Sequence, residues 1–321
     1  MYGIYELAEG VAQIALPTPP GITRPFGFPY NVYVLHGDAS AAVVGTGFAG
    51  SRDALLAALY ELGVDPRRVQ RVLLTSALPE CAGNVELFER ATVLGAGPSL
   101  ELEATERAAD VARMARALAR DARNPTWDES AVDAFVEAYA GATPTHIDAI
   151  AVEDGDRVAL SGTELEILRT PGVGAAALCA YDANARRLFG GDTVQLATPP
   201  RFTDADALLE SLRRLVQLQP AEILPARGGV ERSFAAVFRS LSLSINNLLT
   251  NLPFAMSGPT ALAEMCYRDL GYWPDDLVRF AGTLLRYERM LDTLVRTGVA
   301  HREGEGAWAV YSMDRPSRMG T

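Results

Sequence analysis

Lysine is absent from the 321-residue chain, in which all 29 basic residues are arginine. This absence excludes Schiff-base chemistry on a lysine, a lysine-anchored pyridoxal phosphate and the lysine of a phosphate-binding P-loop. Histidine is scarce as well, with only His36, His146 and His301 in the whole sequence. Any site that needs an imidazole ligand or base must therefore use one of these three residues.

Cysteine and long apolar runs are also scarce. Cys81, Cys179 and Cys266 are far apart and odd in number, which argues against a disulfide framework and for a reducing compartment. No apolar run reaches the roughly 20 residues of a membrane span, and the N-terminus lacks a basic-then-apolar signal. The net charge of −11 argues against nucleic acid as a partner. We therefore expect a cytoplasmic protein without a membrane or nucleic-acid partner.

Hydrophobic residues make up 49% of the chain, which is enough for a sizeable core and too much for a disordered protein. Short apolar runs alternate with helical patterns up to about residue 230, which predicts an α/β fold. The runs that predict strands are 31–36, 41–45, 72–75, 157–160, 165–170, 177–181, 187–190 and 222–224. Helices are predicted to begin at Ser51, at Cys81 and near Thr203.

Residues 102–140 interrupt this alternation. They predict two helices separated at Asn124 and Pro125, the first of them rich in Ala, Arg and Glu. One interpretation is a solvated helical pair inserted between two α/β halves. The other is a lid over a site, because long insertions often carry function.

The segment from 231 to 321 is helical and electrically neutral, with ten Arg and ten Asp or Glu residues. It ends in a helix, a turn at Gly298 and a strand, which together resemble a winged-helix hairpin. A winged helix that binds DNA needs a basic face, so dimerisation or closure of a pocket is expected instead. We divide the chain into residues 1–230, with a helical insertion at about 100–142, and an extension of residues 231–321.

Four segments carry the strongest pattern in the sequence. They read NVYVLHGD at 31–38, VLLTSALPECAGNVELF at 72–88, TPGVGAAALCAYDANARRLFGGDTV at 170–194 and ILPARGG at 223–229. In this order they resemble the motif segments of the metallo-β-lactamase superfamily. The resemblance implies a four-layer αββα sandwich over residues 1–230. The tail resembles the C-terminal extension of the hydrolase branch and is expected to form a helical, winged-helix-like subdomain.

Members of that family bind two zinc ions at strand ends, and the ions turn a bridging water into hydroxide. At the seven matching ligand positions this sequence has Ser76, Leu78, Glu80, Cys81, Val173, Asp192 and Arg227. Only the bridging carboxylate, Asp192, is kept. A dizinc site of this kind takes about five imidazoles, and all three histidines lie at other positions, where surface or capping roles are expected. The resemblance therefore implies the fold without the family's dizinc centre, and no cofactor is expected.

Loss of two zinc ions would leave Glu80 and Asp192 close together without a compensating charge. Arg227 is long and always charged, so we expect its guanidinium to fill the vacated position and to bind Asp192, Glu80 or both. The alternative is that Arg227 extends into solvent. Leu78 and Val173 are expected to pack the floor of the old site.

Other roles at the site stay open. Cys81 is either a nucleophile activated by a helix N-terminus and Arg227 or, as is commoner, an inert buried thiol. A single metal bound by Glu80, Cys81 and Asp192 is a further alternative. Phe28 and Tyr30 form either a hydrophobic wall for a substrate or ordinary anchors of their loop.

Three functions follow from these residues. The first is a metal-independent cyclase, dehydratase or lyase that acts on an acyl, thioester or polyketide-like small molecule, free or carrier-bound, in bacterial specialised metabolism. The second is a pseudoenzyme that binds a ligand or a partner, and the third is a single-metal hydrolase. A homodimer is compatible with each of them. The candidate catalytic residues are Asp192, Glu80, Arg227 and Cys81, and the candidate substrate-binding residues are Ser76, Leu78, Val173, Phe28 and Tyr30.

Overall fold

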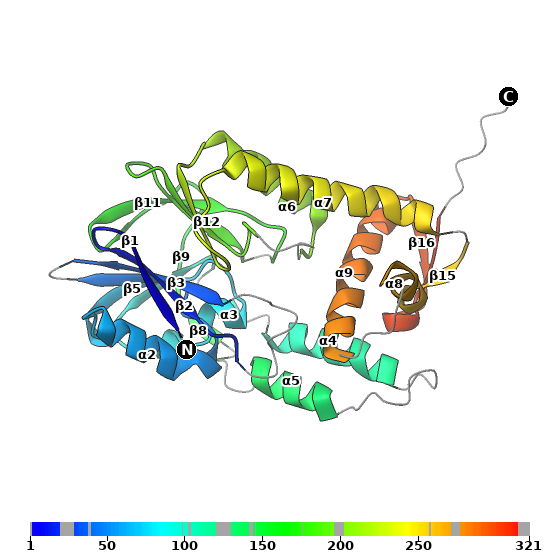
Figure 1. The fold of residues 1–321 in the computed structure, drawn as a ribbon, viewed down its shortest axis with the longest axis horizontal. Coiled ribbons are helices and arrows are strands. Elements are labelled where there is room, and N and C mark those ends of the chain that lie inside the picture. The colour runs from blue at the N-terminus through cyan, green and yellow to red at the C-terminus, as the bar shows by residue number, and fades with distance from the viewer. Residues whose placement is uncertain are drawn as a thin grey trace.

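The computed structural model describes most of the chain. The described residues are 2–19, 29–37, 40–97, 99–101, 104–119, 130–140, 144, 146–174, 176–195, 202–256, 258–270 and 277–313. Two stacked sheets form one end of the molecule, and helices extend from them to the other end (Figure 1).

The first sheet has seven strands in the order β1-β2-β3-β4-β5-β6-β9. These strands are β1 (Gly3–Ala8), β2 (Val11–Leu16), β3 (Tyr30–His36), β4 (Ala41–Val44), β5 (Val69–Leu73), β6 (Thr92–Gly95) and β9 (Ile150–Ala151). Strands β1 to β4 pair antiparallel, and β4, β5, β6 and β9 pair parallel. Helix α2 (Arg52–Glu61) covers the outer face, where Leu55 and Leu59 pack with Val32 and Val43 of the sheet.

The second sheet has the order β10-β11-β12-β13-β14. Its strands are β10 (Arg157–Leu160), β11 (Thr163–Arg169), β12 (Leu178–Asp182), β13 (Arg187–Gly191) and β14 (Glu222–Pro225). Helix α6 (Ala205–Gln217) lies on its outer face (Figure 1). The inner faces of the two sheets share a core that includes Tyr33 and Leu73 from one sheet and Phe189 and Leu224 from the other. The predicted four-layer αββα sandwich is therefore confirmed.

Two predicted helices differ in their details. The helix expected from Cys81 is a single turn, α3 (Pro79–Ala82), followed by a 3-10 turn, η3 (Val85–Leu87). It ends early because the Asn84 N–H, which would bond the Glu80 carbonyl in a longer helix, donates instead to Oγ1 of Thr46 at 3.1 Å. Helix α6 is capped by the Asp204 carboxylate rather than by Thr203.

Short elements complete the fold. They are the pair β7 (Ser99–Glu101) and β8 (His146–Asp148) and the 3-10 turns η1 (Ala49–Ser51), η2 (Pro66–Arg68) and η4 (Gly306–Trp308). His146 is exposed and contacts Asp148 at 3.1 Å, and His301 is exposed as well, as expected of surface histidines.

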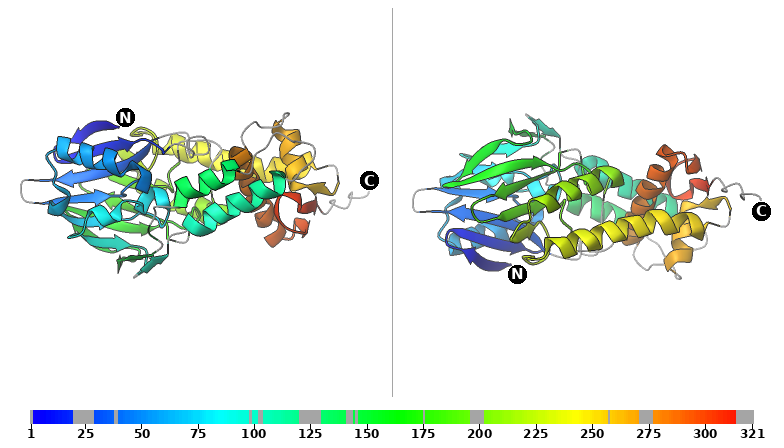
Figure 2. Two further views of the ribbon diagram at one scale, coloured as in Figure 1. Left: turned by 90° about the horizontal axis from the view of Figure 1, so that it is seen from below. Right: turned by 90° about the horizontal axis from the view of Figure 1, so that it is seen from above.

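The two insertion helices are α4 (Ala104–Ala119) and α5 (Ser130–Ala140). The interpretation of a solvated helical pair is wrong, because Met114, Leu118, Val132 and Phe135 are buried. They share one hydrophobic core with the C-terminal helices. Helix α4 packs along α9 (Leu277–Arg296), and α5 lies beside α4 (Figure 2).

The C-terminal part contains three helices and a small sheet. Its remaining elements are α7 (Phe234–Ala255), β15 (Thr260–Ala261), α8 (Leu262–Leu270), β16 (Ala300–Glu303) and β17 (Val310–Met313), with the strand order β15-β17-β16. Helix α7 runs from the sandwich to the far end of the molecule (Figure 1). The helix predicted before Gly298 is the second half of the longer α9. Where one strand is predicted after it, the structure has two, β16 and β17, which form a hairpin.

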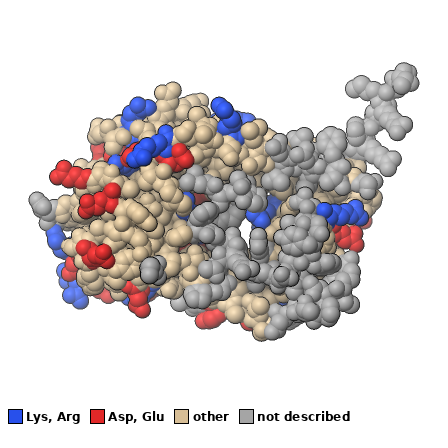
Figure 3. All heavy atoms as spheres, in the orientation of Figure 1, with Lys and Arg blue, Asp and Glu red and all other residues tan. Residues whose placement is uncertain are grey.

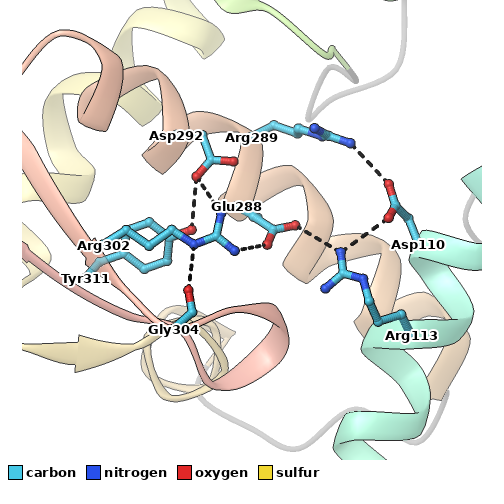
Figure 4. Close-up of polar contacts among 8 residues, drawn as sticks. All are labelled: Asp110, Arg113, Glu288, Arg289, Asp292, Arg302, Gly304 and Tyr311. Carbon is cyan, nitrogen blue, oxygen red and sulfur yellow. Dashed lines mark hydrogen bonds and ion pairs between the residues drawn. The ribbon is translucent and has the colours of Figure 1, made fainter.

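Ion pairs join the insertion to this C-terminal part (Figure 4). On α4, Asp110 contacts Arg289 of α9 at 3.2 Å and Arg113 contacts Glu288 at 3.8 Å. Arg302 of the hairpin lies 2.9 Å from the other oxygen of Glu288. Burial raises the pKa of the Glu288 carboxyl, although the two arginines partly oppose the shift. The insertion and the C-terminal helices are thus joined by charge as well as by their common core.

Acidic side chains are spread over the sandwich end of the face in Figure 3, with arginines between them. Within the described part of the chain, no helix is long and apolar enough to cross a membrane.

Candidate active site

Backbone hydrogen bonds join the loop after β5 to the start of β12, and the loop after β14 to the end of β13. The Leu178 N–H donates to the Thr75 carbonyl, and the Ala226 N–H donates to the Gly191 carbonyl, both at 2.9 Å. Gly191 has a φ of +50°, and a Cβ there would lie 2.8 Å from Cβ of Thr75. Glycine is required at this position because it lets the loop that carries Asp192 approach the loop after β5.

Arg227 and Glu80 form a buried ion pair at this junction. Nη2 of Arg227 lies 3.4 Å from Oε1 of Glu80. Glu80 is 0% exposed and Arg227 is 8% exposed. The expected contact between the guanidinium and a carboxylate is therefore present for Glu80. The alternative in which Arg227 extends into solvent is wrong.

Aromatic rings hold the guanidinium as well. Its Cζ lies 5.3 Å from the centroid of the Tyr30 ring and 5.7 Å from that of the Phe48 ring. Both distances are within the range of cation–π attraction. Tyr30 also forms an isolated antiparallel bridge with Arg227. The Arg227 side chain is thus fixed by a carboxylate and by the quadrupoles of two rings.

Asp192 lies in the same cluster and is 4% exposed. The Ser76 hydroxyl donates to its Oδ2 at 3.2 Å. The negative charge of Asp192 and the positive charge of Arg227 both act on the pKa of the Tyr30 phenol, which burial raises far above its ordinary value. The structure therefore brings Asp192, Ser76, Arg227 and Glu80 into one region, as the motif positions predict.

Cys81 is at the site but is not exposed to it. Its side chain is fully buried and its sulfur lies 3.5 Å from Oγ1 of Thr75. Burial raises the pKa of the thiol, and hydrogen bonds from Thr75 and Tyr30 only partly offset this. Because the thiolate is the nucleophile, the suggested catalytic role of Cys81 is corrected to that of a protonated core residue. Cys179 and Cys266 are buried too, as expected.

Leu78 and Val173 are buried in the core shared with α6 and the insertion, as expected for the floor of the site. Tyr30 lies against Arg227 rather than in a free loop. Phe28, the other proposed wall residue, lies outside the described residues. Contact of these side chains with a substrate stays a prediction.

Three residues that shape the site were missed by the motif comparison. Tyr139 of α5 donates its hydroxyl to Oε2 of Glu80 at 2.9 Å. Phe48 follows β4, and Asn84 follows α3. The Asn84 amide donates to the Phe48 carbonyl at 2.6 Å and to the Thr46 carbonyl at 2.9 Å, so it fixes the loop that places the Phe48 ring. The sequence offers two weak signals for these residues: Asn84 follows a glycine, and Tyr139 is an aromatic residue within the insertion. Neither signal is specific enough to identify a site residue.

A small cavity of about 10 Å³ lies between the sheets next to the site. Its walls include Tyr30, Asn31, Tyr33, Thr75 and Phe189. The volume and the polar walls suit about one water molecule. This cavity is therefore too small to hold a substrate.

The residues present do not fit the family's dizinc centre. Leu78 and Val173 offer no donor atom, and Arg227 places a cation where the last ligand would stand. In the described part of the chain, no three His, Cys, Asp or Glu side chains gather closely enough to hold a metal ion. The alternative of a single metal on Glu80, Cys81 and Asp192 fails the same test. Cys81 is held as a thiol by burial, and Glu80 is bound to Arg227.

Solved structures with the same fold cover almost the whole chain. A metallo-β-lactamase family protein from Thermus thermophilus has a TM-score of 0.74 and 22% identity, over 96% of this chain and all of that one. A β-lactamase domain protein from Burkholderia ambifaria has a TM-score of 0.72 and 18% identity, over 97% of this chain and 93% of that one. These likenesses establish the fold and include the C-terminal helices.

A more distant likeness is to the metal-soaked flavodiiron core of Flv1 from Synechocystis sp. PCC6803. It has a TM-score of 0.54 and 13% identity, over 78% of this chain and 62% of that one. No curated protein matches the chain. The sequence model of the metallo-β-lactamase superfamily matches residues 25–227, well over half of the chain. The protein therefore belongs to the metallo-β-lactamase superfamily, as a member without the histidine metal ligands.

Proposed function

We propose that the protein is a metal-independent enzyme of the cyclase, dehydratase or lyase type, acting on an acyl, thioester or polyketide-like small molecule. The observation that carries the proposal is the placement of the Arg227 guanidinium. Two aromatic rings and Glu80 hold it among the motif loops, and both its charge and that of the Asp192 carboxylate act on the pKa of the Tyr30 phenol. A fixed cation and a carboxylate in one site are a common arrangement for stabilising an oxyanion while a proton moves.

The two carboxylates have different roles in this proposal. Glu80 has no exposed surface and uses one oxygen for Arg227 and the other for Tyr139. It holds the cation and does not meet the substrate. Asp192 is 4% exposed and accepts a hydrogen bond from the Ser76 hydroxyl. Asp192 is therefore the acid and base, and Glu80 is a positioning residue.

A ring closure shows how these groups would act. The Asp192 carboxylate takes a proton from the carbon next to a carbonyl, and the enolate oxygen that forms lies against the Arg227 guanidinium. The enolate carbon then attacks a second carbonyl of the same molecule, which forms a carbon–carbon bond and an alkoxide. Protonated Asp192 returns its proton to the alkoxide, so the carboxylate is regenerated. If the substrate instead carries a hydroxyl on the carbon β to the carbonyl, the enolate pair forms a carbon–carbon double bond, the C–O bond breaks, and the hydroxide leaves as water with the proton from Asp192, which is a dehydration.

The experiment is a turnover screen on protein dialysed against EDTA. The panel contains aryl esters, acyl thioesters, lactones and linear poly-β-ketones, and products are followed by mass spectrometry. The test variants are Asp192→Asn and Arg227→Gln. Asp182→Asn is the control, because Asp182 is also buried but accepts the Asn184 and Ala185 N–H groups at the β12–β13 turn.

We expect turnover that survives EDTA and falls by about 100-fold or more in both test variants, the usual contribution of an acid–base group for Asp192 and of an oxyanion-stabilising donor for Arg227. The Asp182→Asn protein should keep the wild-type rate. Turnover that depends on added zinc, or a rate unchanged by Asp192→Asn, would contradict the proposal.

The second candidate function is a non-catalytic protein that binds a small ligand. It is favoured by the internal partners of both carboxylates, because a site whose charges are already satisfied has less chemistry to offer. The same panel separates the two functions. A ligand that raises the melting temperature of the wild type and is never converted would favour binding over catalysis.

We also propose that residues 231–321 form a winged-helix-like extension that closes the site rather than binding DNA. The order of its elements is helix, strand, helix, helix and hairpin. Its third helix, α9, packs against α4 of the insertion. That contact supports a role in holding the insertion, whose Tyr139 contacts Glu80, over the site.

A further inference from the structure

Tyr139 lies on the insertion helix α5, far from the four motif segments in sequence. It is nevertheless in direct contact with the site, because its hydroxyl donates to Oε2 of Glu80 at 2.9 Å. The other oxygen of that carboxylate, Oε1, faces Nη2 of Arg227 at 3.4 Å. Glu80 thus links the phenol of the insertion to the guanidinium of the sandwich.

The ring of Tyr139 reaches the guanidinium by a second route. It stacks on Phe135, with centroids 5.5 Å apart and planes at 17°, so α5 holds it in one orientation. It also meets Phe48 edge to face at 6.1 Å, and Phe48 lies against Arg227. The phenol and the ring therefore act on the same cation, the first through a carboxylate and the second through an aromatic neighbour.

The packing of the insertion helices fixes the position of Tyr139. Helices α4 and α5 are buried against the C-terminal helices, and the Asp110–Arg289 and Arg113–Glu288 pairs join α4 to α9 (Figure 4). Tyr139 is 1% exposed. A buried, stacked phenol on a helix with this support is a rigid donor rather than a mobile one.

We propose that Tyr139 is the positioning residue that sets the place of the Arg227 guanidinium, acting through Glu80. The functional purpose of this positioning rests on the proposed function, whereas the test of the positioning does not depend on it. A fully buried carboxylate oxygen that loses its donor turns toward another partner. Without the phenol, the Glu80 carboxylate therefore rotates, and the guanidinium moves with it or becomes free to move.

The test is the reactivity of Arg227 toward phenylglyoxal, a small dicarbonyl that modifies guanidinium groups. Peptide mapping by mass spectrometry reports each arginine separately. Arg187 is the internal control, because it is 7% exposed, close to the 8% of Arg227, and is held by Glu222 of β14 at 2.9 Å. Tyr139→Phe keeps the ring stack and removes only the hydroxyl. Tyr181→Phe is the matched variant, because it removes a buried hydroxyl that donates to the Leu218 carbonyl.

We expect Tyr139→Phe to raise the modification rate of Arg227 by roughly tenfold, the effect of losing one hydrogen bond to a charged group. The rate of Arg187 should not change, and Tyr181→Phe should leave both rates at the wild-type value. An unchanged Arg227 rate would overturn the positioning role. Equal increases at Arg227 and Arg187 would also overturn it, because they would show general loosening of the fold.

If Tyr139→Phe does not fold, Phe135→Leu tests the same arrangement. It keeps the phenol and removes the ring on which the phenol is stacked, so a smaller rise confined to Arg227 is expected, and no rise would contradict the inference. These readouts need no substrate. If the turnover screen found no activity, the phenylglyoxal results would still test the positioning role of Tyr139. If the phenylglyoxal results contradicted that role, the proposed chemistry of Asp192 and Arg227 would still be decided by the turnover screen.

Discussion

The ion pair between Arg227 and Glu80 predicts a specific pattern of stability changes. Breaking a buried pair by removing one partner costs about 3–5 kcal/mol, because the other charge is left uncompensated. Arg227→Met leaves Glu80, which is 0% exposed, with the Tyr139 hydroxyl but without the cation. We therefore expect this variant to lose about 3 kcal/mol of unfolding free energy. Glu80→Gln keeps an acceptor for Tyr139 and should lose about 1–3 kcal/mol.

The double variant Arg227→Met/Glu80→Gln tests the pair itself. With both charges removed, no buried charge is left alone, so its loss should be smaller than the sum of the two single losses. A coupling energy of about 1–3 kcal/mol is expected for groups in direct contact. The assay is urea unfolding followed by circular dichroism, compared only between variants with the same slope against urea concentration.

Two other pairs calibrate this measurement. Arg187 and Glu222 form a largely buried pair at 2.9 Å in the second sheet, and the same double cycle there should also give clear coupling. Arg157 and Glu164 form an exposed pair at the same distance, and their coupling should stay below about 0.5 kcal/mol. Coupling between Arg227 and Glu80 as small as that of the exposed pair would refute the buried-pair reasoning.

Three further predictions concern other parts of the fold. Asn84→Ala removes the two amide donors to Thr46 and Phe48 and should cost about 2–3 kcal/mol by urea unfolding, whereas Ala at the exposed Asn184 should leave stability within about 0.5 kcal/mol. Burial alone would raise the pKa of Asp204, but hydrogen bonds from the helix N-terminus and Arg296 lower it below the ordinary 3.8. Its stabilisation is therefore present above pH 3.8 and is lost as the pH falls through the folded pKa, so Asp204→Ala should cost about 1 kcal/mol at pH 7 and progressively less below pH 3.8. Because every cysteine is buried, native protein should show no fast-reacting thiol with a disulfide reagent, and a stoichiometric fast phase at Cys81 would contradict its assignment as a core residue.

Much of the fold could be predicted from the sequence because its signals are local. Strands such as β3, β10 and β13 follow short apolar runs bounded by turn residues, and each lies within a residue of its predicted limits. The length of the helix after β5 could not be predicted, because the Asn84 N–H at its end binds the hydroxyl of Thr46, 38 residues away in sequence. The burial of the insertion could not be predicted either, because α4 contacts α9, which lies far away in the sequence, only in the folded chain.

The site was predictable where the motifs reach it. Positions 76, 80, 192 and 227 follow strand ends, so the sheet topology alone brings them together. The contact between Arg227 and Glu80 followed from charge, because a buried carboxylate without its metal needs another cation. Tyr139 and Phe48 could not be found in this way. Their roles depend on ring geometry and on the packing of an insertion, and neither leaves a pattern in the sequence.

The central claim is that the Arg227 guanidinium takes the place of the family's metal. The most direct test is the metal content of protein purified without chelator from zinc-supplemented culture, measured by plasma mass spectrometry. We predict less than about 0.1 zinc, iron or manganese per chain, because the donor atoms that a site requires are missing. Near-stoichiometric metal that disappears in Asp192→Asn would contradict the claim.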